Sequence, residues 1–163
     1  MSSLSTGRHV ADTDGDFVIY INGMRLNTLR ALPRWIRASR ETAKIFKRLE
    51  ADPDSGFLGY HPAFMGLPKG AAIQYWRSLE DLRRFANDPG DLHVPAWLWY
   101  NETDDGGLGF WAELYVIEAG NCETFYRSIE PTGPGEFFGV VEADERERRL
   151  GLSEDGVVEE SGN

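Results

Sequence analysis

Residues 71–97 restrict the fold of this chain more than any other stretch, because they show where a strand ends and where the helix after it begins. Residues 71–77 are rich in β-branched and aromatic side chains, which predicts a strand. Ser78 and Asp81 follow at the spacing of a capping box, and apolar residues then recur at helical spacing. The stretch therefore predicts a strand that leads directly into an amphipathic helix, which an Asp-Pro-Gly sequence ends.

Similar patterns along the rest of the chain complete the order of elements. Strands are predicted at residues 17–23, 57–65 and 108–118. An amphipathic helix of about 17 residues begins at Pro33, and a short helix is predicted at residues 93–100. The order strand–helix–strand–strand–helix–strand predicts an α+β, ferredoxin-like βαββαβ fold, with helices on one face of a four-stranded antiparallel sheet.

The two ends of the chain differ in composition from its middle. Residues 1–15 are small and polar, whereas residues 141–163 are charged and end in a Ser/Glu/Gly sequence. We therefore expect a flexible lead-in at residues 1–15, a single ferredoxin-like domain at 16–140, and an acidic, disordered tail at 141–163.

The composition of the chain excludes some classes of binding partner and predicts a cellular compartment. The formal net charge is −10, so this acidic protein is a poor partner for nucleic acid or an anionic membrane. No apolar run approaches the roughly 18 residues of a membrane span, and the first residues lack the hydrophobic centre of a signal peptide. We therefore expect a cytoplasmic protein. Cys122 is the only cysteine, which excludes an intrachain disulfide.

Side chains of the predicted last strand alternate between two faces, and both faces carry large apolar groups. One face carries Phe110, Ala112, Leu114 and Val116; the other carries Trp111, Glu113, Tyr115 and Ile117. Helices cover only one face of such a sheet, and soluble monomers avoid exposing an apolar patch of several hundred Å². The pattern therefore predicts a homodimer in which two sheets pair face to face.

Two residues are candidates for acid–base chemistry. His93 follows a Pro/Gly loop and precedes an aromatic segment, where a neutral imidazole would serve as a general base. The alternative for His93 is a loop residue that bonds to the backbone. Glu113 is an acid in an otherwise apolar strand, where burial in a cavity would suit it to act as a base. The alternative for Glu113 is an ion pair with Arg25 or Arg77.

Further residues are candidates for ligand binding. Asn22 and Arg25 lie at the end of the first strand, where an amide and a guanidinium would hold a carbonyl or an oxygen-derived anion, with loop capping as the alternative. His61 would face a cavity from the second strand. The aromatic candidates, which would otherwise form core or dimer interface, are Tyr75, Trp76, Trp97, Trp111 and Tyr115. The spacing of the histidines does not require a metal site, and we expect none.

Several motifs together resemble those of a known family. They are NGMR at residues 22–25, SGFLGY at 55–60, QYWRS at 74–78, HVPAW at 93–97, and GFWAELY at 109–115 followed by ETFY. Over residues 17–135 the chain resembles a family of bacterial and archaeal domains of unknown function. Its members are labelled monooxygenase family proteins, and some are labelled aldoxime-dehydratase-like.

This resemblance implies a dimeric α/β barrel, in which two ferredoxin-like sheets pair and each protomer encloses a cavity. Relatives in that superfamily include cofactor-free monooxygenases that form quinones, haem-dependent aldoxime dehydratases and chlorite dismutases. Family members commonly carry a histidine where this chain has Ala112. The replacement argues against a haem site and makes the expected cavity more apolar.

The leading hypothesis is a homodimeric α/β-barrel protein that binds a small apolar or aromatic molecule. As a cofactor-free monooxygenase it would use His93 or Glu113 to remove a proton, and the substrate carbanion would then reduce dioxygen. One alternative is a non-catalytic ligand-binding or interaction dimer. Another is a haem-binding, aldoxime-dehydratase-like protein with His93 or His61 as the ligand. The sequence leaves open which face of the sheet lines the cavity.

Overall fold

The computed structural model describes residues 7–88, 90 and 92–149 of the chain. These residues form two compact units. The larger unit spans Gly15–Ala119, and the smaller one combines the described residues before Gly15 with those after Ala119. Each unit has its own strands and helices, so each is described by itself.

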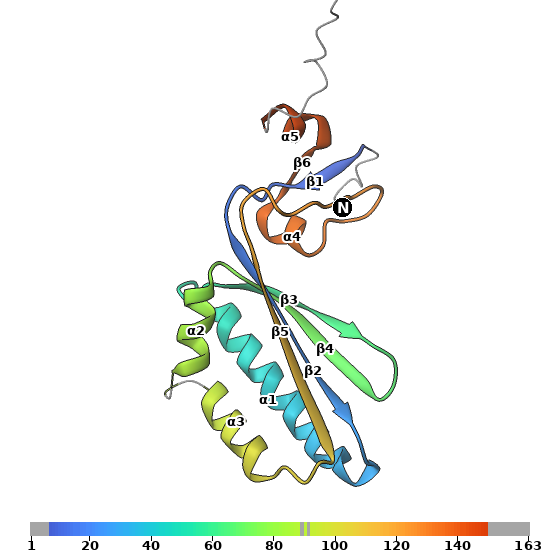
Figure 1. The fold of residues 1–163 in the computed structure, drawn as a ribbon, viewed down its shortest axis with the longest axis vertical. Coiled ribbons are helices and arrows are strands. Elements are labelled where there is room, and N and C mark those ends of the chain that lie inside the picture. Colours follow the sequence, from blue (N-terminus) through green and yellow to red (C-terminus); the bar gives the residue numbers. More distant parts are fainter. Residues whose placement is uncertain (1–6, 89, 91, 150–163) are drawn as a thin grey trace, which may run out of the picture. The chain divides into compact units, whose positions relative to one another are not determined.

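The larger unit is built on a four-stranded antiparallel sheet (Figure 1). Its strands are β2 (Phe17–Leu26), β3 (Phe57–Phe64), β4 (Lys69–Trp76) and β5 (Leu108–Ile117). They lie in the order β3-β4-β2-β5, so β3 and β5 form the two edges of the sheet. The predicted α+β, ferredoxin-like fold is confirmed. Pro62 lies on the edge strand β3, where a missing backbone N–H is tolerated.

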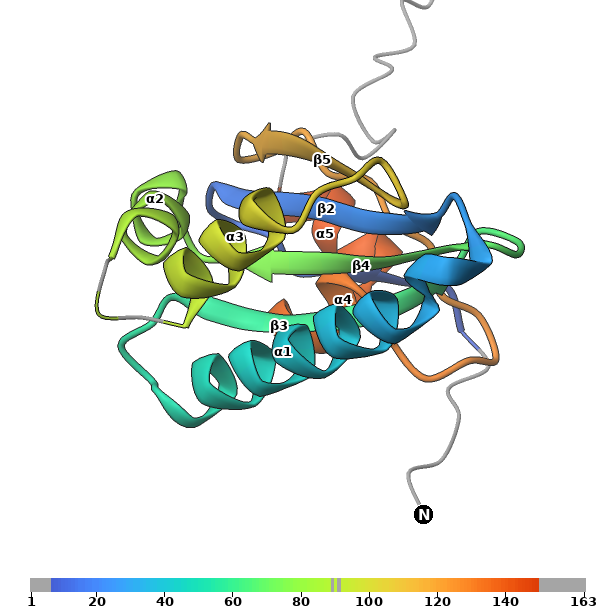
Figure 2. The ribbon, with the colours of Figure 1, turned by 90° about the horizontal axis from the view of Figure 1, so that it is seen from below.

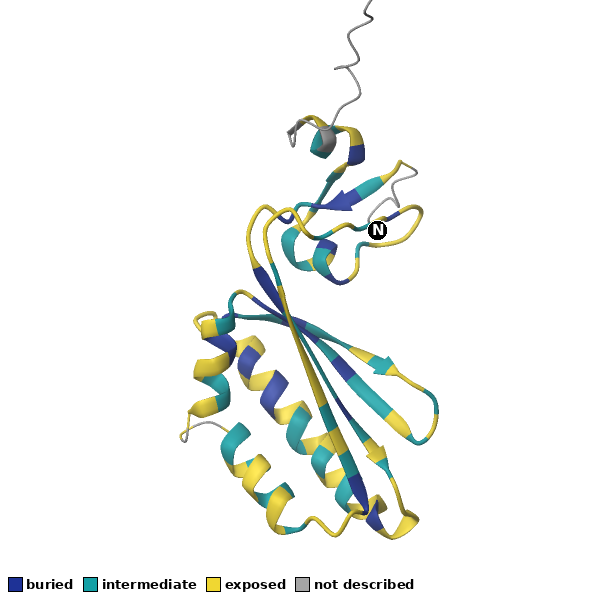
Figure 3. Cartoon of the chain, in the orientation of Figure 1, coloured by how far each residue is buried: buried dark blue, intermediate teal, exposed yellow. Residues whose placement is uncertain are grey.

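Three helices lie on one face of this sheet (Figure 2). They are α1 (Leu32–Ala51), which a short 3₁₀ turn η1 (Leu29–Ala31) precedes, α2 (Leu79–Asn87) and α3 (His93–Glu102). In α1, the buried side chains Ile45, Phe46 and Leu49 recur at helical spacing, so one stripe of the helix meets the sheet. None of the described residues 93–102 of α3 is buried, and Figure 3 accordingly shows no dark blue on this helix.

Helix α2 begins where the capping sequence predicted. The Ser78 hydroxyl oxygen accepts a hydrogen bond from the Asp81 backbone N–H at 3.1 Å. The Asp81 carboxylate accepts hydrogen bonds from the Ser78 hydroxyl at 2.8 Å and from the Arg77 and Arg84 guanidinium groups at 3.2 and 2.5 Å. Gly56 adopts φ +76° beside this carboxylate, and a Cβ atom there would collide with Asp81. The start of α2 is therefore tied to the loop before β3.

The core of the larger unit lies between the sheet and the first two helices. Val18 and Trp76 are almost fully buried at 1% and 0% exposure, and Phe46 and Leu82 cover them from α1 and α2. The Phe57 and Tyr60 rings of β3 pack on Phe46, with the Tyr60 and Phe46 ring centroids 4.0 Å apart. This cluster anchors the helices to the sheet at one end of the layer.

The smaller unit pairs the two ends of the described chain. Strand β1 (His9–Ala11) runs antiparallel to β6 (Val140–Glu142), and helices α4 (Pro134–Phe138) and α5 (Ala143–Arg149) accompany them. The strand in residues 1–15 and the elements after residue 140 differ from the expected flexible lead-in and disordered tail. Three-residue strands are too short to give a periodic signal in the sequence. The remainder of the expected tail, residues 150–163, lies outside the described residues.

No helix in the described part of the chain is both long enough and apolar enough to cross a membrane.

Candidate functional site

A cavity of about 620 Å³ lies between the helices and the sheet of the larger unit. This volume is in the range of small-molecule sites in proteins, which is roughly 300–1,000 Å³. The cavity is on the helix-covered face, which answers the question that alternation in the strands had left open. Its wall combines side chains from β2, β4, β5 and all three helices.

The sheet forms the floor of the cavity through alternate residues. Tyr20, Asn22 and Met24 line it from β2, with Gln74 from β4. Strand register sets Tyr20 opposite Gln74 on one side and sets Asn22 opposite Ala112 of β5 on the other. Because Ala112 has only a methyl group, it leaves space beside the Asn22 amide.

Aromatic rings form much of the opposite wall. The Trp97 ring centroid lies 5.6 Å from that of Tyr100 and 6.0 Å from that of Phe110. Tyr100 and Phe110 are 5.7 Å apart, which closes a three-ring cluster between α3 and β5. The Arg37 guanidinium lies 4.2 Å from the centre of the Trp99 ring, which ties α3 to α1. The wall therefore presents flat apolar surfaces suited to an aromatic ligand.

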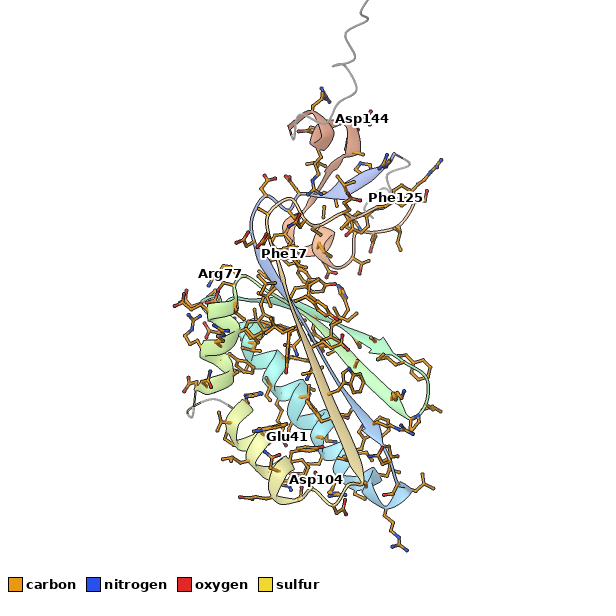
Figure 4. All side chains as sticks on the ribbon, in the orientation of Figure 1. Phe17, Glu41, Arg77, Asp104, Phe125 and Asp144 are labelled. Atoms are coloured by element: carbon orange, nitrogen blue, oxygen red, sulfur yellow. The ribbon has the colours of Figure 1, made fainter. Side chains whose placement is uncertain are left out.

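Few polar groups interrupt this lining. His93, the first residue of α3, lines the cavity, and its ring lies 5.0 Å from that of Phe85. Glu41 of α1, labelled in Figure 4, and Arg83 of α2 also contribute to the wall. Burial raises the pKa of Tyr20, so its hydroxyl stays protonated at neutral pH. The cavity thus combines one imidazole with neutral hydrogen-bonding groups and one charge of each sign.

Gln74, which the sequence reasoning did not select, connects two of the candidates. The Trp76 indole N–H donates to Gln74 Oε1 at 3.1 Å, and Gln74 Nε2 donates to Asn22 Oδ1 at 2.8 Å. Gln74 is only 3% exposed. The available signal was an amide side chain between Ile73 and Tyr75 in a strand that is otherwise apolar, because a buried amide requires partners.

Several predicted site residues face the other side of the sheet. The Tyr115 hydroxyl donates to Glu113 Oε2 at 2.7 Å, and this hydrogen bond raises the pKa of Tyr115. The His61 and Tyr75 rings lie 5.8 Å apart on the same side, where strand alternation also sets Arg25. The sheet separates these residues from the cavity.

The predicted residues therefore fall into three groups. Those whose side chains line the cavity are Asn22, His93 and Trp97. Trp111 borders the cavity from β5, but its indole lies against Gly23 on the face that also carries Glu113 and Tyr115. Trp76 is in the core at 0% exposure. Those on the opposite face are Arg25, His61, Tyr75, Glu113 and Tyr115. Their roles in binding or catalysis stay predictions.

The side chains of the cavity wall can be compared with what a metal ion and a haem each require. Among the described residues, no group of three or more His, Cys, Asp or Glu side chains is arranged to hold a metal ion. A haem could take His93 as its axial ligand but not His61, which lies on the other face. Arg83 is the one cation among the described lining residues, against two propionates on a haem. This lining suits a neutral aromatic ligand better than a haem.

Comparison with known proteins places most of the larger unit in one family. Residues 17–133 match the family model described as Monooxygenase af470-like. A curated relative is Monooxygenase af470 of Aspergillus fumigatus (strain ATCC MYA-4609 / CBS 101355 / FGSC A1100 / Af293). It is 28% identical over 57 residues, which are 35% of this chain and 20% of the relative. The chain therefore spans about a fifth of that protein's length.

Two solved structures are among those similar to this chain. An aldoxime dehydratase (OxdRE) in complex with butyraldoxime superposes with a TM-score of 0.56 at 18% identity, covering 85% of this chain and 39% of that one. SnoaB, a cofactor-independent oxygenase from Streptomyces nogalater, gives a TM-score of 0.44 at 19% identity, covering 61% and 91%. At 18% identity, the similarity to the aldoxime dehydratase shows a shared fold but not a shared function.

Proposed function

The chain belongs to the Monooxygenase af470-like family, and from this premise we propose that it binds a small aromatic molecule in the cavity and oxygenates it without a resident cofactor. The observation that carries the proposal is the lining of the cavity. The clustered rings of Trp97, Tyr100 and Phe110 line one side of a space of about 620 Å³, and His93 supplies the one imidazole among its described lining residues. Such a wall holds a flat substrate and limits the access of water.

His93 supplies the base in this proposal. It takes a proton from an activated methylene group of the substrate, and the carbanion gives one electron to dioxygen. The substrate radical and superoxide combine into a C–O bond, and the peroxide takes up a proton and loses water to leave a ketone. The methylene loses two hydrogens and four electrons, one oxygen atom enters the ketone, and the other leaves as water. Dioxygen is therefore the only oxidant and no external reductant is needed.

Oxygen consumption with anthrone, a tricyclic ketone with an acidic methylene, tests this function. The wild-type protein should consume dioxygen and form the quinone faster than buffer does. His93→Gln should lower the rate by about 10²–10⁴-fold, the usual contribution of a general base. His9→Gln makes the same change in the smaller unit and should leave the rate unchanged. A wild-type rate equal to that of buffer, or a full rate in His93→Gln, contradicts the proposal.

The opposite face of the sheet supports a second part of the proposal, a homodimer. Tyr115 is 47% exposed there, and Ile19, Ile21 and Ile73 of the same face are only half-buried. Pairing of two such faces would remove this apolar surface from water. In that arrangement Glu113 and His61 would lie at the interface rather than in the cavity. If the anthrone experiment finds no oxygenation, the same pairing of faces fits the alternative function, a non-catalytic ligand-binding dimer.

A further inference from the structure

A chain of hydrogen bonds beneath the cavity has a direction that its chemistry enforces. It runs from Trp76, which is fully buried, through Gln74 to Asn22 at the cavity floor. An indole N–H is a donor and never an acceptor. The Gln74 atom that faces it must therefore be the carbonyl oxygen, which turns the Gln74 NH₂ group toward Asn22.

The same reasoning fixes the orientation of Asn22. Because Gln74 donates to it, the facing atom of Asn22 must be its oxygen, 2.8 Å away. The Asn22 NH₂ group is then the end left over. Within the described part of the chain this NH₂ group makes no hydrogen bond to protein, and Asn22 is a half-buried residue that lines the cavity. The floor accordingly offers an N–H donor and not a carbonyl oxygen.

We propose that Trp76 and Gln74 are positioning residues that hold the Asn22 amide with its N–H toward the cavity, so that the site selects aromatic ligands carrying an acceptor oxygen, such as an aryl ketone. This inference rests on the proposed function, since it assumes that the cavity binds aromatic molecules. It adds which hydrogen-bonding group the cavity floor presents to a ligand, and which residues orient that group.

Two features of the floor agree with this assignment. Ala112 lies opposite Asn22 in the strand register, and its small side chain leaves room for a ligand oxygen. Hydrogen bonds in a chain polarise one another, so an Asn22 amide that accepts from Gln74 becomes a better donor. That donor would also stabilise the negative charge that develops on a ketone oxygen when the neighbouring carbon loses a proton.

The test compares two probes of nearly equal shape, α-tetralone, which carries one ketone oxygen, and tetralin, which carries none. Their dissociation constants are measured by tryptophan fluorescence at pH 8 for the wild type and two variants. Asn22→Asp keeps an acceptor for Gln74 but replaces the N–H facing the cavity by an oxygen. Gln74→Glu puts two acceptor oxygens between Trp76 and Asn22, so Asn22 must turn its NH₂ group away from the cavity.

Both variants should weaken α-tetralone binding by about five- to tenfold, the value of one hydrogen bond, and change tetralin binding by less than twofold. Gln74→Glu is the more informative variant, because its effect on a ketone oxygen is transmitted through Asn22. The control Asn101→Asp makes the amide-to-acid change at an exposed residue outside the cavity and should keep both dissociation constants.

The outcomes separate this inference from the function on which it rests. If both probes bind the wild type and both variants keep the wild-type preference between them, the inference is overturned while aromatic binding stands. If neither probe binds the wild type, both proposals are overturned. Circular dichroism checks that each variant folds. Should Gln74→Glu not fold, the response of Asn22→Asp decides in the same way.

Discussion

Ala112 leaves space for a ligand in the cavity beside Asn22. It lies directly opposite Asn22 on the edge strand β5 and contributes only a methyl group to the lining. Because Ala112 is itself exposed, a larger side chain there would extend into the cavity rather than into the core.

Ala112→Phe should therefore weaken binding of α-tetralone at least tenfold while the midpoint of thermal unfolding stays close to that of the wild type. The introduced ring would occupy the space that a ligand needs. Fluorescence titration and a thermal melt measure the two quantities. Ala119→Phe makes the same change at an exposed residue beyond the end of β5 and should leave binding intact. Unchanged affinity in Ala112→Phe would mean that the ligand lies elsewhere.

At this scale, the sequence predicted part of the site. Asn22, His93 and Trp97 were selected from their residue types and flanking turns, and all three line the cavity. Glu113 was selected as an acid in an apolar strand, yet it lies on the opposite face. Alternation assigns residues to a face, but it does not say which face the helices cover when both faces are aromatic.

Among the elements, α2 depends on a buried carboxylate at its start. Burial by itself raises the pKa of Asp81, but hydrogen bonds from Ser78, Arg77 and Arg84 outweigh it, and the pKa is lowered overall. A carboxyl group whose pKa is lower in the folded state stabilises the fold above the pKa of the unfolded chain. That stabilisation is lost as the pH falls through the folded-state pKa.

Asp81→Asn should lower the free energy of unfolding by about 1–3 kcal/mol at pH 7, because the amide loses charge-assisted hydrogen bonds. The difference from the wild type should shrink below the ordinary Asp pKa of about 4, where the unfolded wild-type chain begins to bind a proton at Asp81 and the folded protein does not. Urea unfolding from pH 7 downward measures this. Asp88→Asn at the other end of α2 serves as the control with little expected effect. A loss for Asp81→Asn that is the same at every pH would contradict the account.

Helix α3 is held less firmly than α1. The Tyr100 hydroxyl donates to the Leu108 carbonyl at 3.2 Å, and Arg34 donates to the Thr103 carbonyl and to the Asp105 carboxylate. These contacts, with the stacking of Arg37 on Trp99, fasten a helix none of whose described residues 93–102 is buried. Elements with little buried surface open locally more often than core elements.

Hydrogen exchange should therefore be at least tenfold faster in the amides of α3 than in the second half of α1, where Ile45, Phe46 and Leu49 are buried. Saturating α-tetralone should slow exchange in α3 and leave α1 unchanged, because the ligand would contact Trp97 and Tyr100. Exchange resolved by mass spectrometry measures both. Equal protection of the two helices, or no response of α3 to the ligand, would argue against a site beneath α3.

Elements with a strong local signal were predicted well, and short ones were not. A sequence pattern of several residues marks each of the well-predicted elements. These are the helix that Ser78 caps, the helix that begins near Pro33, and the four strands of the larger sheet. Strands β1 and β6 have three residues each, and they exist because distant parts of the chain pair. Such long-range pairing leaves no periodic trace in either segment.

For the molecule as a whole, the outer face of the sheet predicts self-association. The wild-type protein should elute as a homodimer at micromolar concentration. Tyr115→Arg should shift it toward the monomer, because a charge would be buried in the paired faces. Val116→Arg places the same charge on the same strand but on its other face, and should leave the dimer intact. Light scattering after gel filtration measures the mass. A monomeric wild type, or equal effects of the two variants, would contradict the pairing.

A crystal structure of the protein with bound α-tetralone would show whether the cavity between the sheet and the helices holds an aromatic ligand. We expect the fused rings to lie against Trp97 and Tyr100, with the ketone oxygen about 2.7–3.2 Å from Asn22 Nδ2. Electron density for the ligand on the outer face of the sheet, beside Tyr75 and Tyr115, with the cavity free of ligand, would contradict it.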